Sequence, residues 1–192
     1  WEAMGVLSRS RDTPERVCKP FSSDRDGFVL SEGSAMIVLE TEESCNQRKK
    51  TPIAELIGFT SSCDAESLTS PNLEGVSHVI QKALKDAKIS PIDVDCINLH
   101  GTGTKLNDQT EGAAIKKIFG DQIPLCTASK SQLGHSMGAA SAIEAVISVL
   151  SIRHQIVPPS LNCHPTDPAC HLQNLSPVSR KHKIQNVLSN SF

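Results

Sequence analysis

Tyrosine is missing from this chain of 192 residues, and aromatic residues make up only 3% of it. Proteins that bind single-stranded nucleic acids stack bases on aromatic side chains, so this scarcity argues against such a surface. An excess of charge is missing too, because the formal net charge is −2. A nucleic-acid-binding domain carries a basic patch, and we therefore expect no nucleic-acid partner.

Long apolar runs are also lacking. A helix that spans a membrane needs about 20 predominantly apolar residues, and no stretch of the sequence approaches that length. The opening residues, Trp1 to Gly5, have neither the basic start nor the apolar core of a signal peptide. Because the first residue is not methionine, we expect the sequence to begin within a longer protein or after processing.

The seven cysteines lack the even number and the spacing of a disulfide framework. Cys163-His164 and Cys170-His171 form two pairs, but their separation matches no standard zinc pattern, and we predict no metal site. We expect reduced thiols, as in a cytoplasm or, in a eukaryote, a mitochondrial or plastid matrix. The length and the 38% hydrophobic content suit one soluble globular domain or one large lobe.

Strand-like and helix-like segments alternate along the chain, which predicts a layered α/β fold. Short apolar runs predict buried or half-buried strands at 35–40, 53–59, 94–99, 123–128 and 186–190. Apolar residues at helical spacing predict helices at 72–87, 108–119 and 138–152. The last of these helices is apolar on nearly every side, so we expect it to be buried on most sides.

His100 follows the predicted strand 94–99 and opens the run His-Gly-Thr-Gly-Thr. The glycines permit a tight loop, and Thr102 and Thr104 add hydroxyl groups beside the imidazole. A neutral imidazole in this position can donate a hydrogen bond to a carbonyl oxygen, while the threonines bind the arm of a substrate. The alternative is a histidine that caps a glycine turn.

A second motif, Lys130-Ser-Gln-Leu-Gly-His135, repeats this arrangement after the predicted strand 123–128. The positive end of the following helix favours a neutral His135, and a turn can bring both side chains into one pocket. Glu111 is expected to pair with Lys130 and orient it. The alternatives are a surface lysine, a capping histidine and an ordinary exposed carboxylate.

Together these residues predict a site that holds a thioester carbonyl and stabilises enolate charge. No cysteine has a convincing nucleophile setting, so we interpret the set as half of an active site. The charged turn around Arg25 is interpreted as structural, with this arginine tying down the loop between Asp24 and Asp26.

Four motifs, in this order, resemble those of the β-ketoacyl-[acyl-carrier-protein] synthases of bacterial and organellar fatty acid synthesis. They are Lys19–Gly33, His100–Thr104, Lys130–Ala140 and Asn190–Phe192. The resemblance runs along the whole chain and covers about the C-terminal half of the family's length. It implies a thiolase-like α/β fold in which residues 1–192 form the C-terminal ketosynthase domain. The N-terminal half with the nucleophilic cysteine and the final Gly-Phe-Gly-Gly segment would then be absent.

The resemblance also implies an acyltransferase that condenses malonyl and acyl thioesters with loss of carbon dioxide. It implies a homodimer whose partner is the acyl carrier protein, and no cofactor beyond the phosphopantetheine arm of that carrier. By position, the resemblance gives catalytic roles to His100, His135, Lys130 and Glu111. In the same way, it gives contacts with phosphopantetheine to Thr102 and Thr104.

Two other interpretations stay open: a polyketide-type ketosynthase domain and a non-catalytic partner of the chain-length-factor type. Polyketide-type domains commonly have an Asp-Pro pair after the His-Gly-Thr-Gly-Thr motif, and the segment Asn107–Glu111 lacks it. Partners of the chain-length-factor type tend to lose the catalytic histidines, and this chain keeps both. In isolation, the chain is expected to be inactive in condensation.

Overall fold

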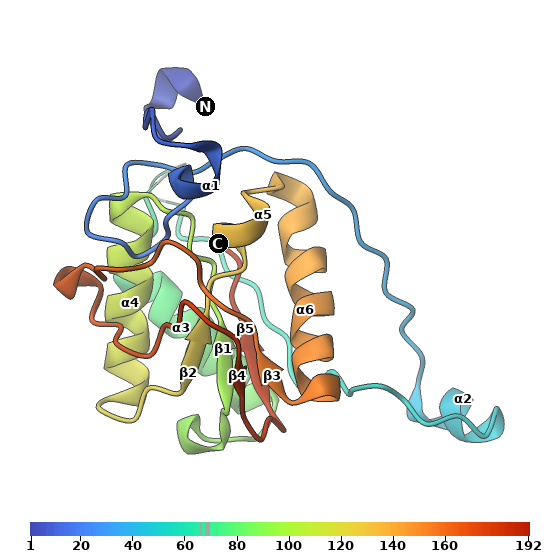
Figure 1. Ribbon diagram of the computed structural model, residues 1–192. Coiled ribbons are helices and arrows are strands. Elements are labelled where there is room, and N and C mark those ends of the chain that lie inside the picture. Colours follow the sequence, from blue (N-terminus) through green and yellow to red (C-terminus); the bar gives the residue numbers. More distant parts are fainter. Residues whose placement is uncertain (66, 68–69) are drawn as a thin grey trace.

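A computed structural model describes residues 1–65, 67 and 70–192. Its centre is a parallel three-stranded sheet, in the order β2-β1-β5. The strands are β1 (Cys96–Asn98), β2 (Leu125–Thr127) and β5 (Val187–Ser189). Two helices cover one face and a third covers the other, as Figure 1 shows; they are α3 (Leu73–Asp86), α4 (Lys105–Phe119) and α6 (Ala140–His154).

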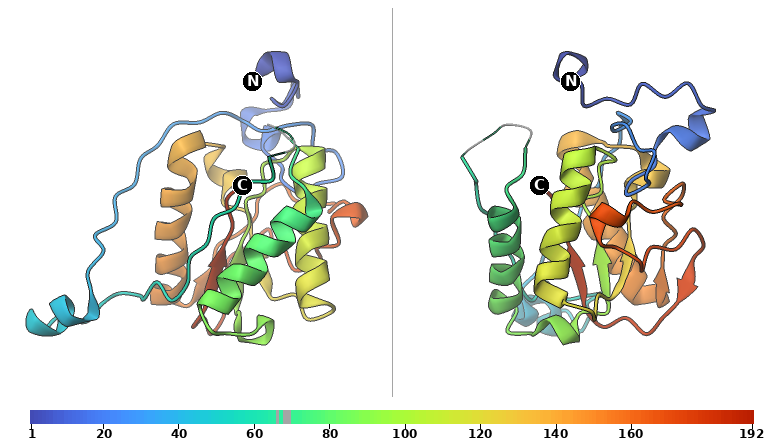
Figure 2. Two further views of the ribbon diagram at one scale, coloured as in Figure 1. Left: turned by 180° about the vertical axis from the view of Figure 1, so that it is seen from behind. Right: turned by 90° about the vertical axis from the view of Figure 1, so that its left-hand side faces the viewer.

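The remaining elements are short and lie outside these three layers (Figure 2). A second, antiparallel sheet pairs β3 (Ile156–Val157) with β4 (Arg180–Lys181). The short α-helices are α1 (Pro14–Val17), α2 (Glu42–Gln47) and α5 (Lys130–Leu133). The 3-10 helices are η1 (Glu2–Met4), η2 (Pro91–Asp93), η3 (Met137–Ala139) and η4 (Pro168–Cys170). The predicted layered α/β fold is therefore confirmed.

Helix α3 forms where the apolar stripe predicted it. The side chain of Asn72 caps the helix by accepting hydrogen bonds from the backbone N–H groups of Glu74 and Gly75. The stripe is buried against α4 and the sheet, in the core cluster that includes Ile80 and Ile115. Burial of such side chains contributes about 1.5–3 kcal/mol each, which fixes α3 and α4 on this face.

Three of the five predicted strands form, with shorter bounds than expected. In the parallel register, Ile97 of β1 lies opposite Cys126 of β2 and Leu188 of β5. All three β1 residues are buried. Helices lie on both faces of the sheet, which explains why these strands are continuous apolar runs rather than alternating ones. The chain therefore leaves β1 and β2 at the same edge of the sheet.

The predicted strands at 35–40 and 53–59 do not form. Both segments are extended but have no strand pairing with other described residues, and their apolar side chains face outward: Met36 is 91% exposed, Val38 83% and Phe59 71%. Figure 1 shows the chain leaving the body here and carrying α2 away from it. A strand is stable only beside another strand, and within the described residues none lies next to these two.

Helix α6 is also less enclosed than its composition predicts. Its buried residues are Ala140, Glu144, Ser148 and Ser151, whereas Leu150 is 42% exposed. Across the part of the chain that the structure describes, no helix is long and apolar enough to cross a bilayer. The seven cysteines are all free, and Cys163 and Cys170 are buried in the core.

Candidate active site

His100 follows the end of β1, and hydrogen bonds to Glu111 fix its backbone. Its N–H donates to Glu111 Oε1 at 2.8 Å, and the next N–H, of Gly101, donates to Glu111 Oε2 at 2.9 Å. Gly101 has φ +45°, and a Cβ there would lie 2.9 Å from Phe21 Cε2. The turn therefore requires glycine at this position, and it directs a buried imidazole toward Lys130.

Lys130 begins α5 directly after β2, and it is almost completely buried. Its Nζ donates to the carbonyl oxygen of His100 at 2.6 Å, lies 3.3 Å from His100 Nδ1, and forms an ion pair with Glu144. An ammonium group has only donors, so Nδ1 must accept this hydrogen bond. The proton of the neutral ring is then on Nε2, which is left as a hydrogen-bond donor.

His135 reaches the same tautomer through a different partner. Its Nδ1 accepts a hydrogen bond from the backbone N–H of Met137 at 3.1 Å, so its proton is also on Nε2. The two imidazole rings lie with centroids 5.5 Å apart and planes at 87°. The site thus contains two adjacent N–H donors on neutral rings, as the predicted role of these histidines requires.

The electrostatics of the site keep both rings neutral. Burial, and then the positive charge of Lys130, holds the pKa of His100 well below its usual value. Burial, and then the charge of Lys130, lowers the pKa of His135 to about 4. Donors that stay neutral at physiological pH stabilise developing negative charge on an oxygen without giving up a proton.

The carboxylate that pairs with Lys130 is Glu144 of α6, so the predicted pairing with Glu111 is wrong. Glu144 is 2% exposed, and its carboxylate also accepts hydrogen bonds from Ser129 at 3.3 Å and Ser191 at 3.5 Å. The signal available in the sequence is that Glu144 is the one carboxylate in this Ala-, Ile- and Val-rich helix. Such a charge is kept in a buried helix only when a partner neutralises it.

Glu111 is completely buried, so an ordinary exposed carboxylate is also excluded. Besides the two backbone N–H groups, its Oε1 accepts a hydrogen bond from Asn190 Nδ2 at 3.1 Å. Burial raises the pKa of Glu111 to about 7, against the lowering effect of these hydrogen bonds. In this structure, Glu111 therefore holds the backbone beside His100 rather than orienting the lysine.

One helical turn before Glu111, Asp108 fixes the far side of the same loop. It accepts hydrogen bonds from the backbone N–H groups of Phe21 at 2.7 Å and Gly103 at 3.2 Å. Arg25 is fully buried, and its Nε lies 3.2 Å from Asp108, while its Nη1 lies 2.8 Å from Asp167. The predicted structural role of Arg25 is supported, but its partners are distant in sequence.

Asp24 and Asp26, the predicted partners of Arg25, bind other groups. Asp24 accepts from Lys19 Nζ at 2.8 Å, and Asp26 accepts from the hydroxyl of Ser8 at 2.5 Å and the backbone N–H of Arg9 at 2.9 Å. Adjacent side chains on a tight turn point apart, so the buried guanidinium pairs with carboxylates that the fold brings to it.

Thr102 and Thr104 lie together on this loop, with hydroxyl oxygens 3.0 Å apart. The loop is locked by an unusual approach of two glycines: Gly27 N–H donates to Gly103 O at 3.0 Å. A Cβ on Gly103, which has φ +83°, would lie 2.8 Å from the carbonyl oxygen of Gly27. The loop that follows His100 thus carries both hydroxyls, and their predicted contact with phosphopantetheine stays a prediction.

The aromatic rings of Phe28 and Phe192 complete the surroundings of the histidines. Phe28 lies 5.1 Å from His135 and Phe192 lies 5.6 Å from His100, both edge to face. The thiol of Cys18 also contacts the site, because it donates to the carbonyl oxygen of Lys130 at 2.8 Å. Burial raises the pKa of this thiol to about 11, so it is neutral and unsuited to nucleophilic attack.

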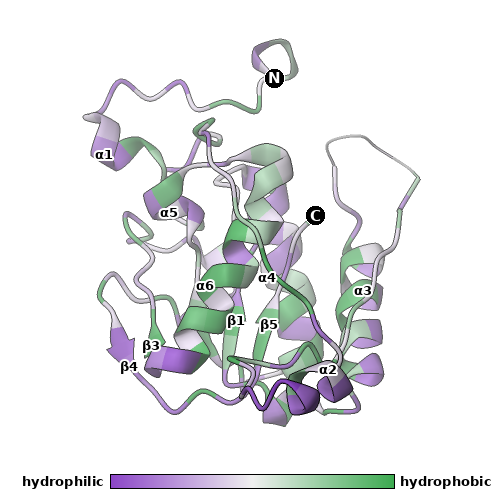
Figure 3. Ribbon diagram, turned by 90° about the vertical axis from the view of Figure 1, so that its right-hand side faces the viewer, coloured by the Kyte–Doolittle hydropathy of each residue, from purple (hydrophilic) through white to green (hydrophobic). Residues whose placement is uncertain are grey.

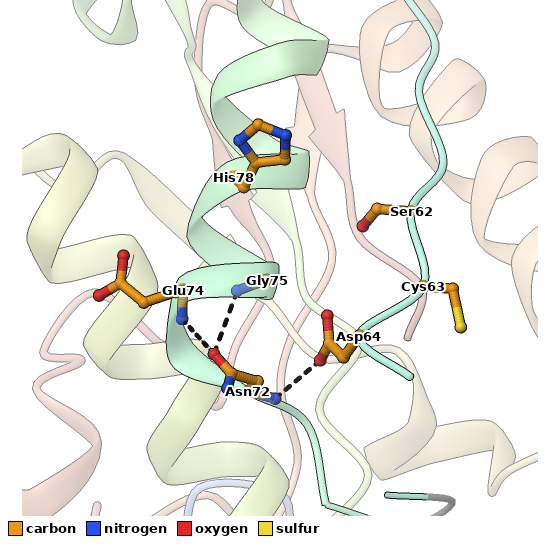
Figure 4. A pocket seen from close by; sticks show the side chains of 7 residues that line it. All are labelled: Ser62, Cys63, Asp64, Asn72, Glu74, Gly75 and His78. Carbon is orange, nitrogen blue, oxygen red and sulfur yellow. Dashed lines mark hydrogen bonds between the residues drawn. The ribbon is translucent and has the colours of Figure 1, made fainter. Parts of the chain in front are cut away.

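A separate cavity of about 440 Å³ lies at the beginning of α3, as Figure 4 shows. It is lined by Ser62, Cys63, Asp64, Asn72, Glu74, Gly75 and His78. None of these is a histidine or lysine of the site just described. The carboxylate of Asp64 accepts from the backbone N–H of Asn72 at 2.9 Å, and it stands where a Cβ of Gly75 would lie. We assign the chemistry to the His100 loop, because the two histidines and Lys130 meet there.

Comparison with known families identifies this arrangement. The family described as "Beta-ketoacyl synthase, C-terminal domain" matches residues 53–164. The family described as "Beta-ketoacyl synthase, N-terminal domain" matches residues 1–44. The chain belongs to the β-ketoacyl synthase family. It is 45% identical to Nodulation protein E of Rhizobium sp. (strain N33) over 100% of its length. It is 44% identical to 3-oxoacyl-[acyl-carrier-protein] synthase 2 of Coxiella burnetii (strain RSA 493 / Nine Mile phase I) over 99% of its length.

The chain spans about half the length of these curated relatives, 47% in both cases. Solved structures agree: a β-ketoacyl synthase from Burkholderia phymatum STM815 matches with a TM-score of 0.95 and 33% identity, over 100% of this chain and 47% of that one. The ishigamide ketosynthase/chain length factor matches with a TM-score of 0.91 and 41% identity, over 98% and 45%. The predicted family and its thiolase-like fold are confirmed.

Proposed function

We propose that this chain supplies the His/His/Lys part of the active site of a 3-oxoacyl-[acyl-carrier-protein] synthase of fatty acid biosynthesis. The observation that carries the proposal is the pair of neutral imidazoles, both protonated on Nε2 and both fixed at Nδ1. The reaction is the decarboxylative condensation of malonyl-[acyl-carrier-protein] with an acyl thioester. Relatives such as the Coxiella burnetii protein carry this activity in their names.

The two donors suit the charge that develops in this reaction. When the bond between the α-carbon and the carboxylate of the malonyl group breaks, carbon dioxide leaves and its electron pair stays as an enolate. The Nε2–H groups of His100 and His135 donate to the enolate oxygen and lower the energy of this state. The α-carbon then attacks the acyl carbonyl, and the thiolate that carried the acyl group leaves.

Lys130 acts through the histidines in this scheme. Its ammonium group holds both the carbonyl oxygen and the Nδ1 of His100, and its charge disfavours protonation of either ring. Glu144 neutralises that charge, so the lysine is stable in a buried position. Lys130 is accordingly a positioning residue in this proposal.

The proposal includes partners that the chemistry requires. Malonyl and acyl thioesters would arrive on the phosphopantetheine arm of an acyl carrier protein, with Thr102 and Thr104 as contacts for that arm. One solved neighbour is a ketosynthase in complex with the acyl-carrier protein of a type II PKS. The proposal also includes a homodimer, no cofactor of the protein's own, and a cytoplasmic, mitochondrial or plastid location.

A polyketide-type ketosynthase is the second candidate, because that neighbour matches 98% of this chain with a TM-score of 0.93 and 37% identity. The two candidates differ in the product: a fatty acid synthase reduces each 3-oxoacyl product before the next round, whereas a polyketide enzyme extends unreduced chains. Analysis of the chain products made with malonyl-[acyl-carrier-protein] alone separates them.

The test of the proposed function is His100→Ala in the protein that contains this chain. We expect a loss of decarboxylation and condensation of at least about 100-fold, as for removal of one oxyanion donor. His154→Ala, at the exposed end of α6, is the matched control and should keep full activity. Full activity of His100→Ala would overturn the assignment. The 192-residue chain alone should form no acyl thioester that can be passed to a carrier protein.

A further inference from the structure

The last quarter of the sequence carries a net positive charge, although the whole chain is slightly negative. Residues 145–192 contain four of the 19 lysines and arginines and one of the 21 acidic residues, a formal charge of +3. The other 15 basic and 20 acidic residues lie in 1–144, with a formal charge of −5. Such an asymmetry of charge within one chain indicates a partner of opposite charge for the basic part.

The fold brings these cations together at one end of the molecule. Arg180 and Lys181 form β4, which pairs with β3 so that Lys181 lies opposite Ile156. The backbone N–H of His182 donates to the carbonyl oxygen of Gln155 at 3.1 Å, and Gln155 directly follows the last turn of α6. The basic end of α6 therefore lies beside β4, and Figure 3 shows both as hydrophilic segments. We call the following exposed residues the β4 patch: Arg153, His154, Arg180, Lys181, His182 and Lys183.

The charge of the β4 patch is not neutralised within the described part of the chain, where no acidic side chain forms an ion pair with it. Asp167, the one acidic residue of the last quarter, pairs with Arg25 instead. Asp95 lies near the end of the patch, but its carboxylate accepts hydrogen bonds from the backbone N–H groups of Gln185 at 2.7 Å and Asn186 at 3.0 Å. The patch therefore presents its positive charge to its surroundings.

The β4 patch lies at the opposite edge of the central sheet from the two histidines. Gln155 Nε2 donates to the carbonyl oxygen of Ile184 at 2.8 Å, just before β5 begins. His100, in contrast, follows the end of β1, which runs parallel to β5. Figure 1 shows α1 and α5 at one end of the body and β3 and β4 at the other. A partner bound to the patch would thus leave the His100 loop uncovered.

We propose that the β4 patch is a docking surface for a membrane that contains anionic lipids. This inference goes beyond the proposed function and does not depend on it, because no residue of the patch belongs to the site. Clusters of four or more lysines and arginines bind anionic lipid head groups, and the patch has four. Val178, which is 64% exposed just before β4, adds an apolar side chain that can enter the head-group region.

The composition of the patch favours lipid over other anionic partners. A surface for single-stranded nucleic acid stacks bases on aromatic rings, and the run 177–183 has no phenylalanine, tyrosine or tryptophan. An interface with an acidic protein has an apolar centre and a polar rim. Here the charged residues follow one another, and the exposed Val178 stands at one end of the run. Lysines on an edge strand also prevent strands of different molecules from pairing, but that role requires no lipid.

The test is cosedimentation of the protein that contains this chain with lipid vesicles. One set of vesicles contains about one-third phosphatidylglycerol in phosphatidylcholine, and the other contains phosphatidylcholine alone. Replacing Arg180, Lys181 and Lys183 together by Gln should weaken binding to the anionic vesicles about 100-fold, since each basic residue near such a surface contributes about five-fold. The charge-preserving variant, with Arg180→Lys, Lys181→Arg and Lys183→Arg, should bind as the wild type does.

The matched control replaces Arg9, Arg11 and Arg16 by Gln. These three arginines are exposed, lie in and before α1 at the other end of the molecule, and give the same change of net charge. We expect this control to keep most of the binding, because its substitutions leave the β4 patch intact.

Equal binding of the wild type to both kinds of vesicle, or no binding to either, would overturn the proposal. Full binding by the Gln variant of the patch would do the same and leave only the edge-strand role, as would an equal loss in the control. Phosphate and chloride at equal ionic strength should release the protein equally. Stronger release by phosphate would assign the patch to free phosphate, and preferential binding to polyglutamate would assign it to an acidic protein, and either result would overturn the lipid proposal.

Discussion

Two glutamates enter the site from opposite faces of the central sheet, and they stabilise it in different ways. Glu111 of α4 accepts hydrogen bonds from two backbone N–H groups and an amide, all of them neutral. Glu144 of α6 pairs with the ammonium group of Lys130. Both are buried, but only Glu144 has a full opposite charge beside it. A buried carboxylate can thus hold a loop when its partners are neutral N–H groups, or neutralise a charge when its partner is an ammonium group.

Glu144→Ala should have the largest effect on this comparison. It leaves the charge of Lys130 buried without its carboxylate, and we expect a loss of about 3–5 kcal/mol in the free energy of unfolding. Urea unfolding measures it. Glu144→Ala with Lys130→Met removes both charges and should recover part of the loss. Equal stabilities for wild type and Glu144→Ala would show that the ion pair contributes little.

Glu111→Gln tests the other carboxylate through its dependence on pH. Because burial raises the pKa of Glu111 from 4.5 to about 7, the folded state binds more protons than the unfolded chain between these values. Its contribution is fully present below pH 4.5 and is lost as the pH rises through about 7. Glu111→Gln should flatten the fall in stability across this window, measured by urea unfolding at several pH values. An unchanged slope would contradict the raised pKa.

Asn190 and Ser191 offer a smaller and closely matched comparison, because they are neighbours that bind one glutamate each. Asn190 donates to Glu111 at 3.1 Å, whereas Ser191 lies 3.5 Å from Glu144, at the limit for a hydrogen bond. We expect Asn190→Ala to cost about 1–3 kcal/mol, because it leaves a buried acceptor without one partner. Ser191→Ala should cost under about 0.5 kcal/mol. If thermal unfolding showed Ser191→Ala to be more destabilising than Asn190→Ala, the relative strengths assigned to these two hydrogen bonds would be wrong.

The parts of the site that follow from local sequence could be predicted. His100 and Lys130 stand directly after apolar runs, so strand ends could be assigned to them and their meeting at one edge of the sheet expected. The tautomers could not be predicted, because they depend on Lys130 Nζ and on the backbone N–H of Met137. These are contacts made by turns whose geometry the sequence pattern does not specify.

The errors concern partners that lie far apart in the sequence. Arg25 was paired with its neighbours, whereas its partners Asp108 and Asp167 are brought to it by the fold. Glu144 could not be assigned as the partner of Lys130, because the apolar pattern of its helix does not show which way a single charged side chain points. The predicted strand at 53–59 has the right alternation but lacks a neighbouring strand among the described residues, and a strand cannot supply that by itself.

The contact between Gly27 and Gly103 has a consequence for how this protein can change over generations. Most tight contacts tolerate a larger residue on one side if a mutation makes the other side smaller. Here backbone meets backbone: a Cβ on Gly103 would lie 2.8 Å from the carbonyl oxygen of Gly27, and a Cβ on Gly27 would lie 2.5 Å from the backbone of Leu7, so there is no neighbouring side chain to shorten. No second mutation can therefore compensate for the loss of either glycine, so both should persist in lineages where much of the surrounding surface has been replaced.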